Sequence, residues 1–293
     1  MKVSIIILNY NGKQYLMDCL SSIRKQTFQD FEIILFDNGS TDYSFENNIP
    51  PDLEVFKLIR SKTNLGFAEG NNWAILHAEG EYVVLLNNDT IVDEHWLEEL
   101  VKVMDSSENI AVATSKILRL KSHGGYTYLT YIIESAGLIF DDGIFPRLRG
   151  SGEHDHGQYD TQCYVWGASG CSMMIRKSVI DKLGLFDSSY FAYCEDVDFC
   201  WRVNEAGLKI VYNPNSIVYH YGGGTSKQGF DVAMLIEHNK AKTIKKHGSF
   251  GLKCNFIISE LIIMIKSEIG YICGKNKVGA YPYANAILEL FKR

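Results

Sequence analysis

The cysteines of this sequence show no pairing pattern. There are seven of them in 293 residues, no two are spaced as a CxxC pair, and their positions form no regular framework. An odd number of cysteines in a chain of this size argues against a disulfide-stapled secreted domain, and it predicts reduced thiols in a cytoplasmic protein.

Long apolar runs are also missing. No segment reaches the roughly 18 uninterrupted apolar residues that a membrane-spanning helix needs. The run Val3–Leu8 ends at Asn9, which is too short for a signal peptide and predicts a first strand. No GxGxxG motif follows this strand, which argues against a dinucleotide-binding dehydrogenase.

The chain as a whole has no excess of basic residues. Its net charge of −6 argues against a nucleic-acid-binding protein. From Lys240 onward, however, there are ten Lys or Arg and three Asp or Glu, a balance of +7, whereas residues 1–239 hold the other 19 basic and 32 acidic residues, a balance of −13. Such a tail is expected to contact an anionic membrane surface, at the inner face of the cell membrane, although an ordinary solvated helix would have the same charge. The tail is also a reasonable place for a homodimer contact.

The residues that are present indicate an α/β protein. Hydrophobic residues make up 46% of the chain and charged residues 22%, as in an ordinary globular protein. Strand and helix patterns alternate over the first 110 residues, which predicts a mostly parallel twisted sheet flanked by helices. The expected strands of this region are Val3–Leu8, Glu32–Phe36, Val55–Arg60 and Tyr82–Leu86, and the expected helices are Gln14–Gln26 and a segment ending near Ala78.

Beyond residue 110 the pattern loosens, and we expect only short strands between residues 111 and 161. Further on, the expected helices are Lys177–Leu183 and Glu195–Ala206, the expected strands are Ile210–Tyr212 and Ile217–Tyr219, and the tail is expected to hold helices over Val232–Lys246 and Phe256–Ile272. Gly207 is expected to end the helix that Glu195 begins.

Three carboxylates lie within four positions, at Glu195, Asp196 and Asp198. Like charges this close repel each other, and nearby aromatic residues reduce their hydration, so the cluster needs a cap, a metal or a catalytic role to offset its cost. Two further acids, Asp37 and Asp89, each follow a run that is typical of a buried strand. In parallel sheets ligands bind beyond the carboxyl ends of the strands, so these acids predict an active site there.

Six segments in this order resemble the family-two inverting glycosyltransferases with a GT-A nucleotide-sugar fold, particularly rhamnosyltransferase-like and galactofuranosyltransferase-like members. The segments are Ser4–Asn11, Asp37–Asp42, Asn64–Asn72, Asn87–Asp89, Glu195–Asp198 and Tyr219–His220. The resemblance implies a GT-A glycosyltransferase domain over residues 1–226, with a nucleotide-binding half (1–110) and an acceptor and catalytic half (111–226). Residues 227–293 would form a C-terminal helical tail.

The resemblance implies a nucleotide-binding role for seven residues. Asp37 matches the acid that reads the nucleotide base, although a turn-forming aspartate before Asn-Gly is the alternative interpretation. The segment Asn64–Asn72 matches a loop that lies along the nucleotide, although a plain helix N-terminus would look similar. The full nucleotide-binding set is Asn9, Asn11, Asp37, Asn64, Gly66, Asn71 and Asn88.

The resemblance also implies a divalent cation, Mn²⁺ or Mg²⁺, on the donor diphosphate. Asp89 matches the last acid of the family's DxD motif, but Asn87 replaces the first acid. His220 matches a histidine that some members use as a further ligand, and an imidazole favours Mn²⁺. The alternative for His220 is a structural histidine.

Asp196 matches the family's catalytic base, which takes the proton of the acceptor hydroxyl, and Glu195 would position or tune it. Alternatively these acids only cap a helix. Asp198 is expected to pair with Arg202, four residues on, on a solvated face. Trp166, Ser169 and Gly170 match positions that shape the acceptor pocket, with core packing as the alternative for Trp166.

The expected function is transfer of one sugar from dTDP-rhamnose or a UDP-sugar to a hydroxyl of a glycan or lipid-linked glycan, as in cell-surface polysaccharide assembly. The missing acid at Asn87 leaves a second hypothesis open, a non-catalytic sugar-nucleotide-binding or scaffold subunit. A nucleotidyltransferase ranks last, because the Gly-rich basic segment that meets a triphosphate is absent after the first strand.

Overall fold

The computed structural model describes residues 1–45, 49–50, 53, 56–123, 126–141, 143–222, 232–273 and 279–292. The predicted domain boundary between residues 226 and 227 lies outside them, as does Val55, the first residue of one expected strand.

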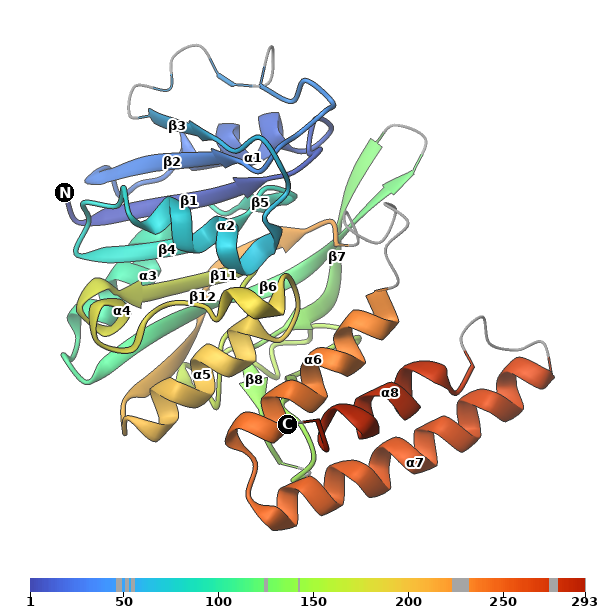
Figure 1. Ribbon diagram of the computed structural model, residues 1–293. Helices are drawn as coiled ribbons and strands as arrows, with labels where there is room; N and C mark the ends of the chain where they lie inside the picture. Colours follow the sequence, from blue (N-terminus) through green and yellow to red (C-terminus); the bar gives the residue numbers. More distant parts are fainter. Residues whose placement is uncertain are drawn as a thin grey trace.

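A large mixed sheet forms the centre of the molecule, with its strands in the order β10-β12-β6-β11-β4-β1-β2-β3 (Figure 1). The strands of this path are β1 (Val3–Asn9), β2 (Phe31–Asp37), β3 (Phe56–Arg60), β4 (Tyr82–Asn87), β6 (Ile110–His123), β10 (Cys163–Tyr164), β11 (Ser172–Arg176) and β12 (Lys209–His220). Two more strands pair at its sides, β5 (Thr90–Val92) with β12 and β7 (Tyr126–Ser135) with β6. A separate pair is β8 (Leu138–Ile139) with β9 (Arg147–Leu148).

The neighbours β3, β2, β1 and β4 are parallel, as are β6 and β12, whereas β11 runs antiparallel between β4 and β6. The predicted α/β fold with a mostly parallel sheet is therefore confirmed. In the parallel register Asn9 lies opposite Asp37, so the polar residues that end β1 and β2 meet at one edge of the sheet, as expected.

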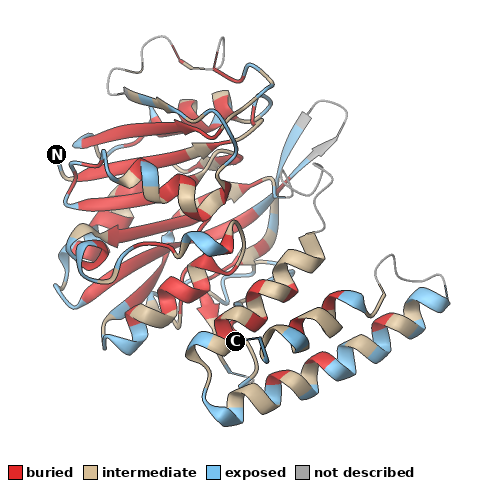
Figure 2. Ribbon diagram, in the orientation of Figure 1, coloured by how far each residue is buried: buried red, intermediate tan, exposed pale blue. Residues whose placement is uncertain are grey.

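Helices cover both faces of the sheet because alternate residues of each strand point to opposite sides. Ile5 and Ile7 pack with α1 (Leu16–Ile23) and α3 (Trp96–Asp105) on one face. Ile6 packs on the other face with α2 (Gly66–Ile75), α4 (Lys177–Leu183) and α5 (Glu195–Glu205). Figure 2 shows the result as a buried sheet between partly exposed helices.

Two expectations for the second half of the chain are wrong. Instead of short strands after residue 110, β6 and β7 are long and form an antiparallel pair. The two short late strands are a single strand, β12, whose pairing with β6 shifts register between Asn213 and Ile217. That irregularity explains why the pattern looks like two separate segments.

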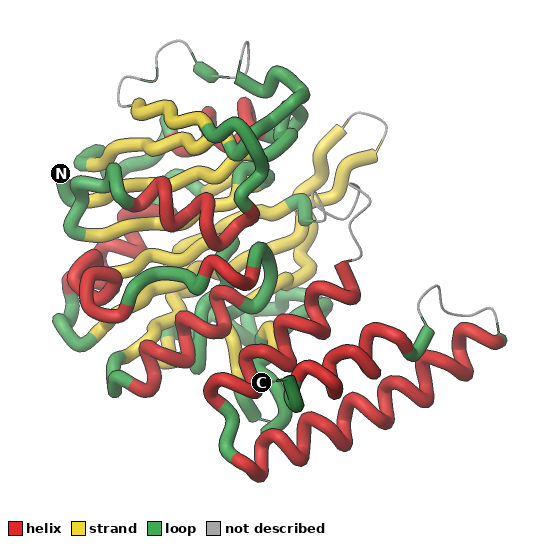
Figure 3. Tube along the Cα trace, viewed as in Figure 1, coloured by secondary structure: helices red, strands yellow, loops and turns green. Residues whose placement is uncertain are grey.

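The described part of the tail holds the helices α6 (Val232–His247), α7 (Phe250–Ile272) and α8 (Tyr281–Glu289). They lie together beside the sheet layer, with α6 next to the body and α7 on the outside (Figures 1 and 3). The expected first tail helix is confirmed, the second begins at Phe250 rather than Phe256, and α8 was not expected. Among the described residues no helix is both long and apolar enough to cross a membrane.

Candidate active site

A pocket with a cavity volume of about 240 Å³ opens at the carboxyl ends of β1, β2 and β4. Six predicted site residues line it: Asn11, Asn64, Gly66, Asn88, Asp89 and His220. The segment Phe191–Tyr193, which leads into α5, supplies another part of the wall. The pocket therefore brings together groups from both halves of the chain.

Asn9 and Asn88 are hydrogen-bonded to each other at the pocket. The fully buried Asn9 donates from Nδ2 to Ser40 Oγ (3.1 Å) and accepts from Asn88 Nδ2 (2.7 Å). A Cβ at Gly12 would lie only 2.1 Å from Asn88 Nδ2, so this glycine leaves room for the asparagine pair. Asn9 supports the pocket from behind, while Asn88 also lines it.

Asp37 lies at the end of β2 and is 7% exposed. Its Oδ1 accepts the backbone N–H of Ser40 at 3.0 Å, which is the contact of a turn-forming aspartate. It is not among the residues that line the pocket. Asn11 lines the pocket with a positive φ of 50°, and its Oδ1 accepts the N–H of Thr41 at 2.8 Å.

Asn38, which the sequence analysis did not single out, organises the loop before α2. Its Nδ2 donates to Asn64 Oδ1 and to the Gly66 carbonyl, both at 3.0 Å, and its Oδ1 accepts the N–H of Leu65 at 2.9 Å. Asn38 therefore ties the predicted nucleotide loop to the end of β2. Asn71, also predicted here, is buried and donates to the Phe67 carbonyl within its own helix.

Asp89 and His220 face the same space at the pocket wall, with Oδ1 and Nε2 3.0 Å apart. The other ring nitrogen of His220 lies 2.7 Å from Glu134 Oε1, and Asn87 Nδ2 lies 3.4 Å from Nε2. Burial lowers the pKa of His220, but Cys171 and Asp89 raise it, and the net pKa is well above the ordinary value.

This pair suits a divalent cation. A carboxylate and an imidazole are both ligands for Mn²⁺, and a carboxylate behind the imidazole is a common way to orient a ligating histidine. No group of three or more His, Cys, Asp or Glu side chains in the described part of the chain is arranged to hold a metal. A cation held by Asp89 and His220 would therefore need oxygen ligands from a bound phosphate.

Asp196 and Gly170, predicted for catalysis and for the acceptor, are in direct contact. The Gly170 N–H donates to Asp196 Oδ2 at 2.9 Å, and the Val197 N–H donates to Oδ1 at 2.8 Å. Burial raises the pKa of Asp196, although both N–H groups oppose the rise. Glu195 is 5% exposed, and its Oε2 has no hydrogen-bond partner among the described residues. Burial raises the pKa of Glu195 well above its usual range, and the neighbouring Asp196 raises it further.

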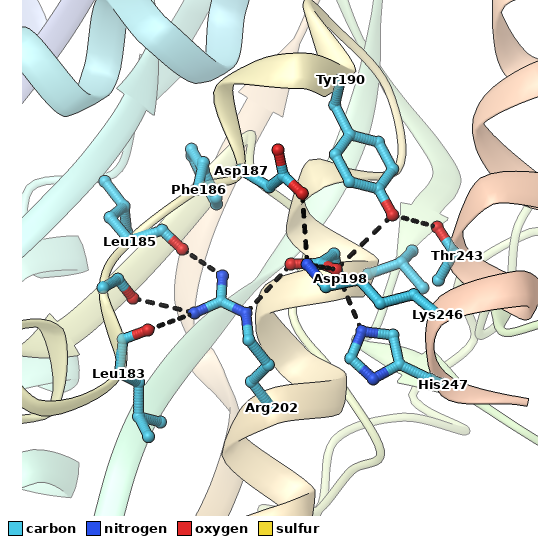
Figure 4. A network of polar contacts seen from close by, with 12 residues as sticks. Leu183, Leu185, Phe186, Asp187, Tyr190, Asp198, Arg202, Thr243, Lys246 and His247 are labelled. Carbon is cyan, nitrogen blue, oxygen red and sulfur yellow. Dashed lines mark hydrogen bonds and ion pairs between the residues drawn. The ribbon is translucent and has the colours of Figure 1, made fainter. Parts of the chain in front are cut away.

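Asp198 has a different role from its two neighbours. The expected pair with Arg202 is present, with Nε and Oδ2 3.0 Å apart, but the expected solvated face is wrong because Asp198 is completely buried. Lys246 and His247 of α6 also reach Asp198 Oδ1, at 2.7 and 3.0 Å (Figure 4). Burial raises the pKa of this carboxyl, but the contacts with His247, Lys246 and Arg202 outweigh it and hold the pKa far below the usual value.

Trp166 and Ser169 lie beyond the pocket lining. Trp166 makes an edge contact with Trp201, with ring centroids 5.3 Å apart, which agrees with the packing alternative. Ser169 accepts the N–H of Cys171 on its Oγ at 3.3 Å.

Several residues at and around the pocket had no clear sequence signal. Phe191–Tyr193 line the pocket from an irregular segment, and Glu134, which contacts His220, comes from β7, in the region whose pattern is loose. Asn38 did have a sequence signal, because it directly follows Asp37 within the segment Asp37–Asp42 that resembles the family.

Comparison with known proteins agrees with this fold. Residues 4–184 match the family described as glycosyl transferase family 2, which is more than half of the chain, and the protein belongs to this family. The predicted family and GT-A fold are thus confirmed, and the family is one of glycosyltransferases.

Among curated relatives, an uncharacterized glycosyltransferase of Haemophilus influenzae is 26% identical over 250 residues, covering 83% of this chain and 71% of the relative. The hexosyltransferase Agl10 of low-salt glycan biosynthesis in Haloferax volcanii is 27% identical over 212 residues, covering 71% of this chain and 63% of its own length. The O-antigen biosynthesis protein RfbC of Myxococcus xanthus is 29% identical over 229 residues, covering 75% of this chain and 17% of its own. Apart from the first, these relatives are matched over less than two thirds of their length.

Solved structures share the fold at low sequence identity. The structure of GalNAc-T7 with UDP, GalNAc and Mn²⁺ has a TM-score of 0.68 at 18% identity, covering 84% of this chain and 48% of that one. The structure of Staphylococcus aureus TarS 1–349 with UDP-GlcNAc has a TM-score of 0.57 at 16% identity, covering 99% and 72%.

Proposed function

We propose that this protein is an inverting, metal-dependent hexosyltransferase that moves one sugar from a nucleoside diphosphate sugar to a hydroxyl of a glycan or lipid-linked glycan. The observation that carries the proposal is the shared pocket. Asp89 and His220 stand 3.0 Å apart on its wall, and the segment leading into Glu195 and Asp196 forms another side. The candidate cation ligands thus share a cavity with the segment that leads into the candidate base, while Glu195 and Asp196 themselves are not among its lining residues.

In this proposal the nucleotide lies along Asn11, Asn64, Gly66 and Asn88, with Asp37 and Asn9 holding the turn behind it. The donor is dTDP-rhamnose or a UDP-sugar. Asp89 and His220 would hold Mn²⁺ or Mg²⁺, which supplies positive charge to the departing diphosphate when bound.

Asp196 takes the proton of the attacking hydroxyl. Its pKa is raised by burial, which makes it a stronger base than an ordinary aspartate, while the N–H groups of Gly170 and Val197 fix its orientation. Glu195 next to it is also buried, and a negative charge on one of the two carboxyl groups disfavours a negative charge on the other. The protonation of Glu195 and the protonation of Asp196 are therefore expected to depend on each other. The acceptor would approach over Ser169 and Gly170, with Trp166 behind them.

The relatives and structural neighbours support the substrate class. Proteins of similar sequence are named for O-antigen biosynthesis and for the synthesis of poly-β-1,6-N-acetyl-D-glucosamine. Similar folds have been solved with UDP-GlcNAc, and with GDP-mannose and Mn²⁺. Assembly of a cell-surface polysaccharide is the process that fits these names.

The test is sugar transfer by purified protein with Mn²⁺, a panel of nucleotide sugars and glycan acceptors. Asp196→Asn should keep donor affinity and lower turnover by about 100-fold or more, since a positioned base contributes roughly that much. Asp181→Asn, an exposed aspartate on α4, is the matched control and should keep full activity. Equal turnover in both variants would refute the base assignment.

The same assay separates the alternative of a non-catalytic sugar-nucleotide-binding subunit. The presence of Asn87 in place of an acid motivates that alternative. It predicts nucleotide binding without metal dependence, no transfer and no donor hydrolysis, and an Asp89→Ala variant with unchanged affinity in calorimetry. The transferase proposal predicts that Asp89→Ala weakens nucleotide binding in the presence of Mn²⁺.

We further propose that the protein works in the cytoplasm, at the inner face of the membrane, where a lipid-linked acceptor would be found. The support is an apolar stripe on α7. Ile258, Ile262, Ile265, Ile269 and Ile272 are all exposed, and their spacing puts them on one helix face. Such a helix with basic residues around it suits an anionic membrane surface.

A further inference from the structure

The segment between the 3-10 turn Ser188–Tyr190 and α5 has an unusual backbone. Phe191, Tyr193 and Cys194 have φ values of 60°, 69° and 68°, although none of them is glycine. Side chains with a Cβ rarely adopt positive φ, and such a conformation lasts only where surrounding contacts hold it. Contacts from elsewhere in the fold must therefore hold this segment.

Asn239 of α6 supplies them. Its Nδ2 donates to the carbonyls of Tyr190, Ala192 and Tyr193, at 2.9, 2.8 and 2.9 Å. Carbonyl oxygens only accept hydrogen bonds, so the amide nitrogen of Asn239 must face the segment. Its two N–H groups are shared among the three carbonyl oxygens. The side chain is 1% exposed, so water does not compete for these bonds.

The held segment in turn contacts the pocket on two sides. The Phe191 carbonyl accepts the backbone N–H groups of Phe67 and Ala68, the latter at 3.1 Å. Both belong to the first turn of α2, directly after the pocket residue Gly66. At its other end the segment runs into Glu195 and Asp196 through Cys194, the residue that precedes α5.

Other residues on the same face of α6 strengthen the attachment. Thr243 Oγ1 lies 2.9 Å from the Tyr190 hydroxyl, and Lys246 and His247 bind Asp198 on α5 (Figure 4). Positions 239, 243, 246 and 247 follow the helical repeat and lie on one face. The tail helix thus holds both the segment before the catalytic cluster and the helix that carries it.

We propose that Asn239 is a positioning residue for the transferase, which fixes segment 190–194 and so sets the pocket wall, the start of α2 and the start of α5. This inference rests on the proposed function. Asn239 touches none of the reacting atoms; it acts through the backbone of the segment. The tail is then part of the machinery that shapes the donor site.

The test compares three variants of the full chain. Asn239→Asp keeps the shape of the side chain and removes both donors, and Thr243→Val is a milder change on the same face. Asn255→Ala is the matched control, because Asn255 also donates from the tail to the body, at 3.3 Å to the Gly143 carbonyl, away from the segment.

Two readouts are needed. Hydrogen exchange should become about tenfold faster or more at the amides of Phe67 and Ala68 in Asn239→Asp, less so in Thr243→Val, and not in Asn255→Ala. Steady-state kinetics should show a higher KM for the donor, about tenfold in Asn239→Asp, with a smaller fall in kcat. A variant that is merely less stable would lose active molecules and lower kcat with KM unchanged.

Unchanged exchange at Phe67 and Ala68 together with an unchanged donor KM would overturn the inference, as would an equal effect of Asn255→Ala. If Asn239→Asp does not fold, Thr243→Val carries the same comparison. Absence of nucleotide binding and transfer in the wild type would refute the proposed function alone, because the exchange comparison needs no ligand.

Discussion

At the scale of single residues, Gly66 links the donor loop to the segment before α5. Its φ is +85°, and an added Cβ would lie 2.5 Å from the Phe191 carbonyl oxygen. Gly66→Ala combines a disfavoured backbone with a backbone clash, so we expect a loss of roughly 2 kcal/mol or more in the free energy of unfolding and weaker nucleotide binding. Chemical denaturation and calorimetry with UDP measure the two effects.

Gly184→Ala is the control for that prediction. Gly184 has a φ of +72°, but nothing lies within 4 Å of an added Cβ. Only the backbone cost remains, roughly 1–3 kcal/mol because φ 72° with ψ 160° is a region that only glycine adopts readily, and nucleotide affinity should not change. Equal effects of the two substitutions would show that the contact with Phe191 has no importance for the pocket.

Glu134 is a second residue whose role can be measured alone. It lies 2.7 Å from Nδ1 of His220, which leaves Nε2 directed toward Asp89. Removing a carboxylate behind a ligating histidine typically costs about 10-fold to 100-fold in metal affinity. We expect Glu134→Gln to weaken Mn²⁺ binding, measured by calorimetry with UDP present, by about 10-fold.

Glu153 is an exposed glutamate of the same region, and Glu153→Gln should leave Mn²⁺ binding unchanged. Equal Mn²⁺ affinity in both variants would contradict a role for Glu134.

At the scale of elements, the contact between α6 and α7 contains a buried acid. Glu260 of α7 is 2% exposed, and burial, with Glu237 of α6 nearby, raises its pKa to about 7. Lys240 opposes the rise and pairs with Glu237 at 2.9 Å. The Oε2 atoms of Glu237 and Glu260 have no hydrogen-bond partner among the described residues.

The pH dependence follows from this raised pKa. Between the ordinary value of about 4.5 and about 7 the folded chain binds more protons at Glu260 than the unfolded chain, so the free energy of unfolding falls as pH rises through this range. The loss is on the order of 3 kcal/mol. Glu260→Gln should therefore be more stable than the wild type at pH 8 and nearly equal to it at pH 5.

Thermal unfolding at the two pH values checks this expectation. Glu108→Gln, at an exposed glutamate after α3, is the control and should follow the wild type at both. A Glu260→Gln variant with the same advantage at pH 5 as at pH 8 would place the gain outside the ionisation of Glu260.

At the scale of the whole molecule, the first half was predictable because β1, β2 and β4 are short apolar runs buried on both faces. Each run ends in polar residues, so Asn9, Asp37 and Asp89 mark the sheet edge even without the fold. The second half was harder to predict, since β6 and β7 expose polar and aromatic side chains such as Tyr128 and Tyr131 and lack such runs. The residues of the candidate site that come from the first half could therefore be predicted from the sequence. Glu134, which comes from β7, could not.

The attachment of the tail could not be predicted from local patterns. The pair of Asp198 and Arg202 follows from helical spacing, but the burial of Asp198 comes from Lys246 and His247, more than forty positions later. Asn239 gives no sequence signal, because its three acceptors are backbone carbonyls of any residue type. Tertiary contacts of this kind depend on the packing of α6, which no local period specifies.

The outer face of α7 gives a prediction for the whole molecule. We expect the full-length protein to sediment with vesicles that contain anionic lipid at low salt, and to be released as salt rises, because the tail has a balance of +7. Ile265 is 57% exposed on the apolar stripe, and Ile265→Glu should lower the partition coefficient about tenfold or more, since burying such a side chain contributes roughly 1.5–3 kcal/mol.

Leu76 provides the matched control, because it is 72% exposed but lies on the body, directly after α2. Leu76→Glu should sediment like the wild type. The alternative is that a second copy of the chain covers the stripe, and sedimentation velocity without lipid tests for such a dimer. If the wild type is a dimer that Ile265→Glu dissociates, and if it does not bind vesicles, the stripe serves self-association. A monomer that binds anionic vesicles through Ile265 would instead bring the pocket to the surface where a lipid-linked acceptor is held.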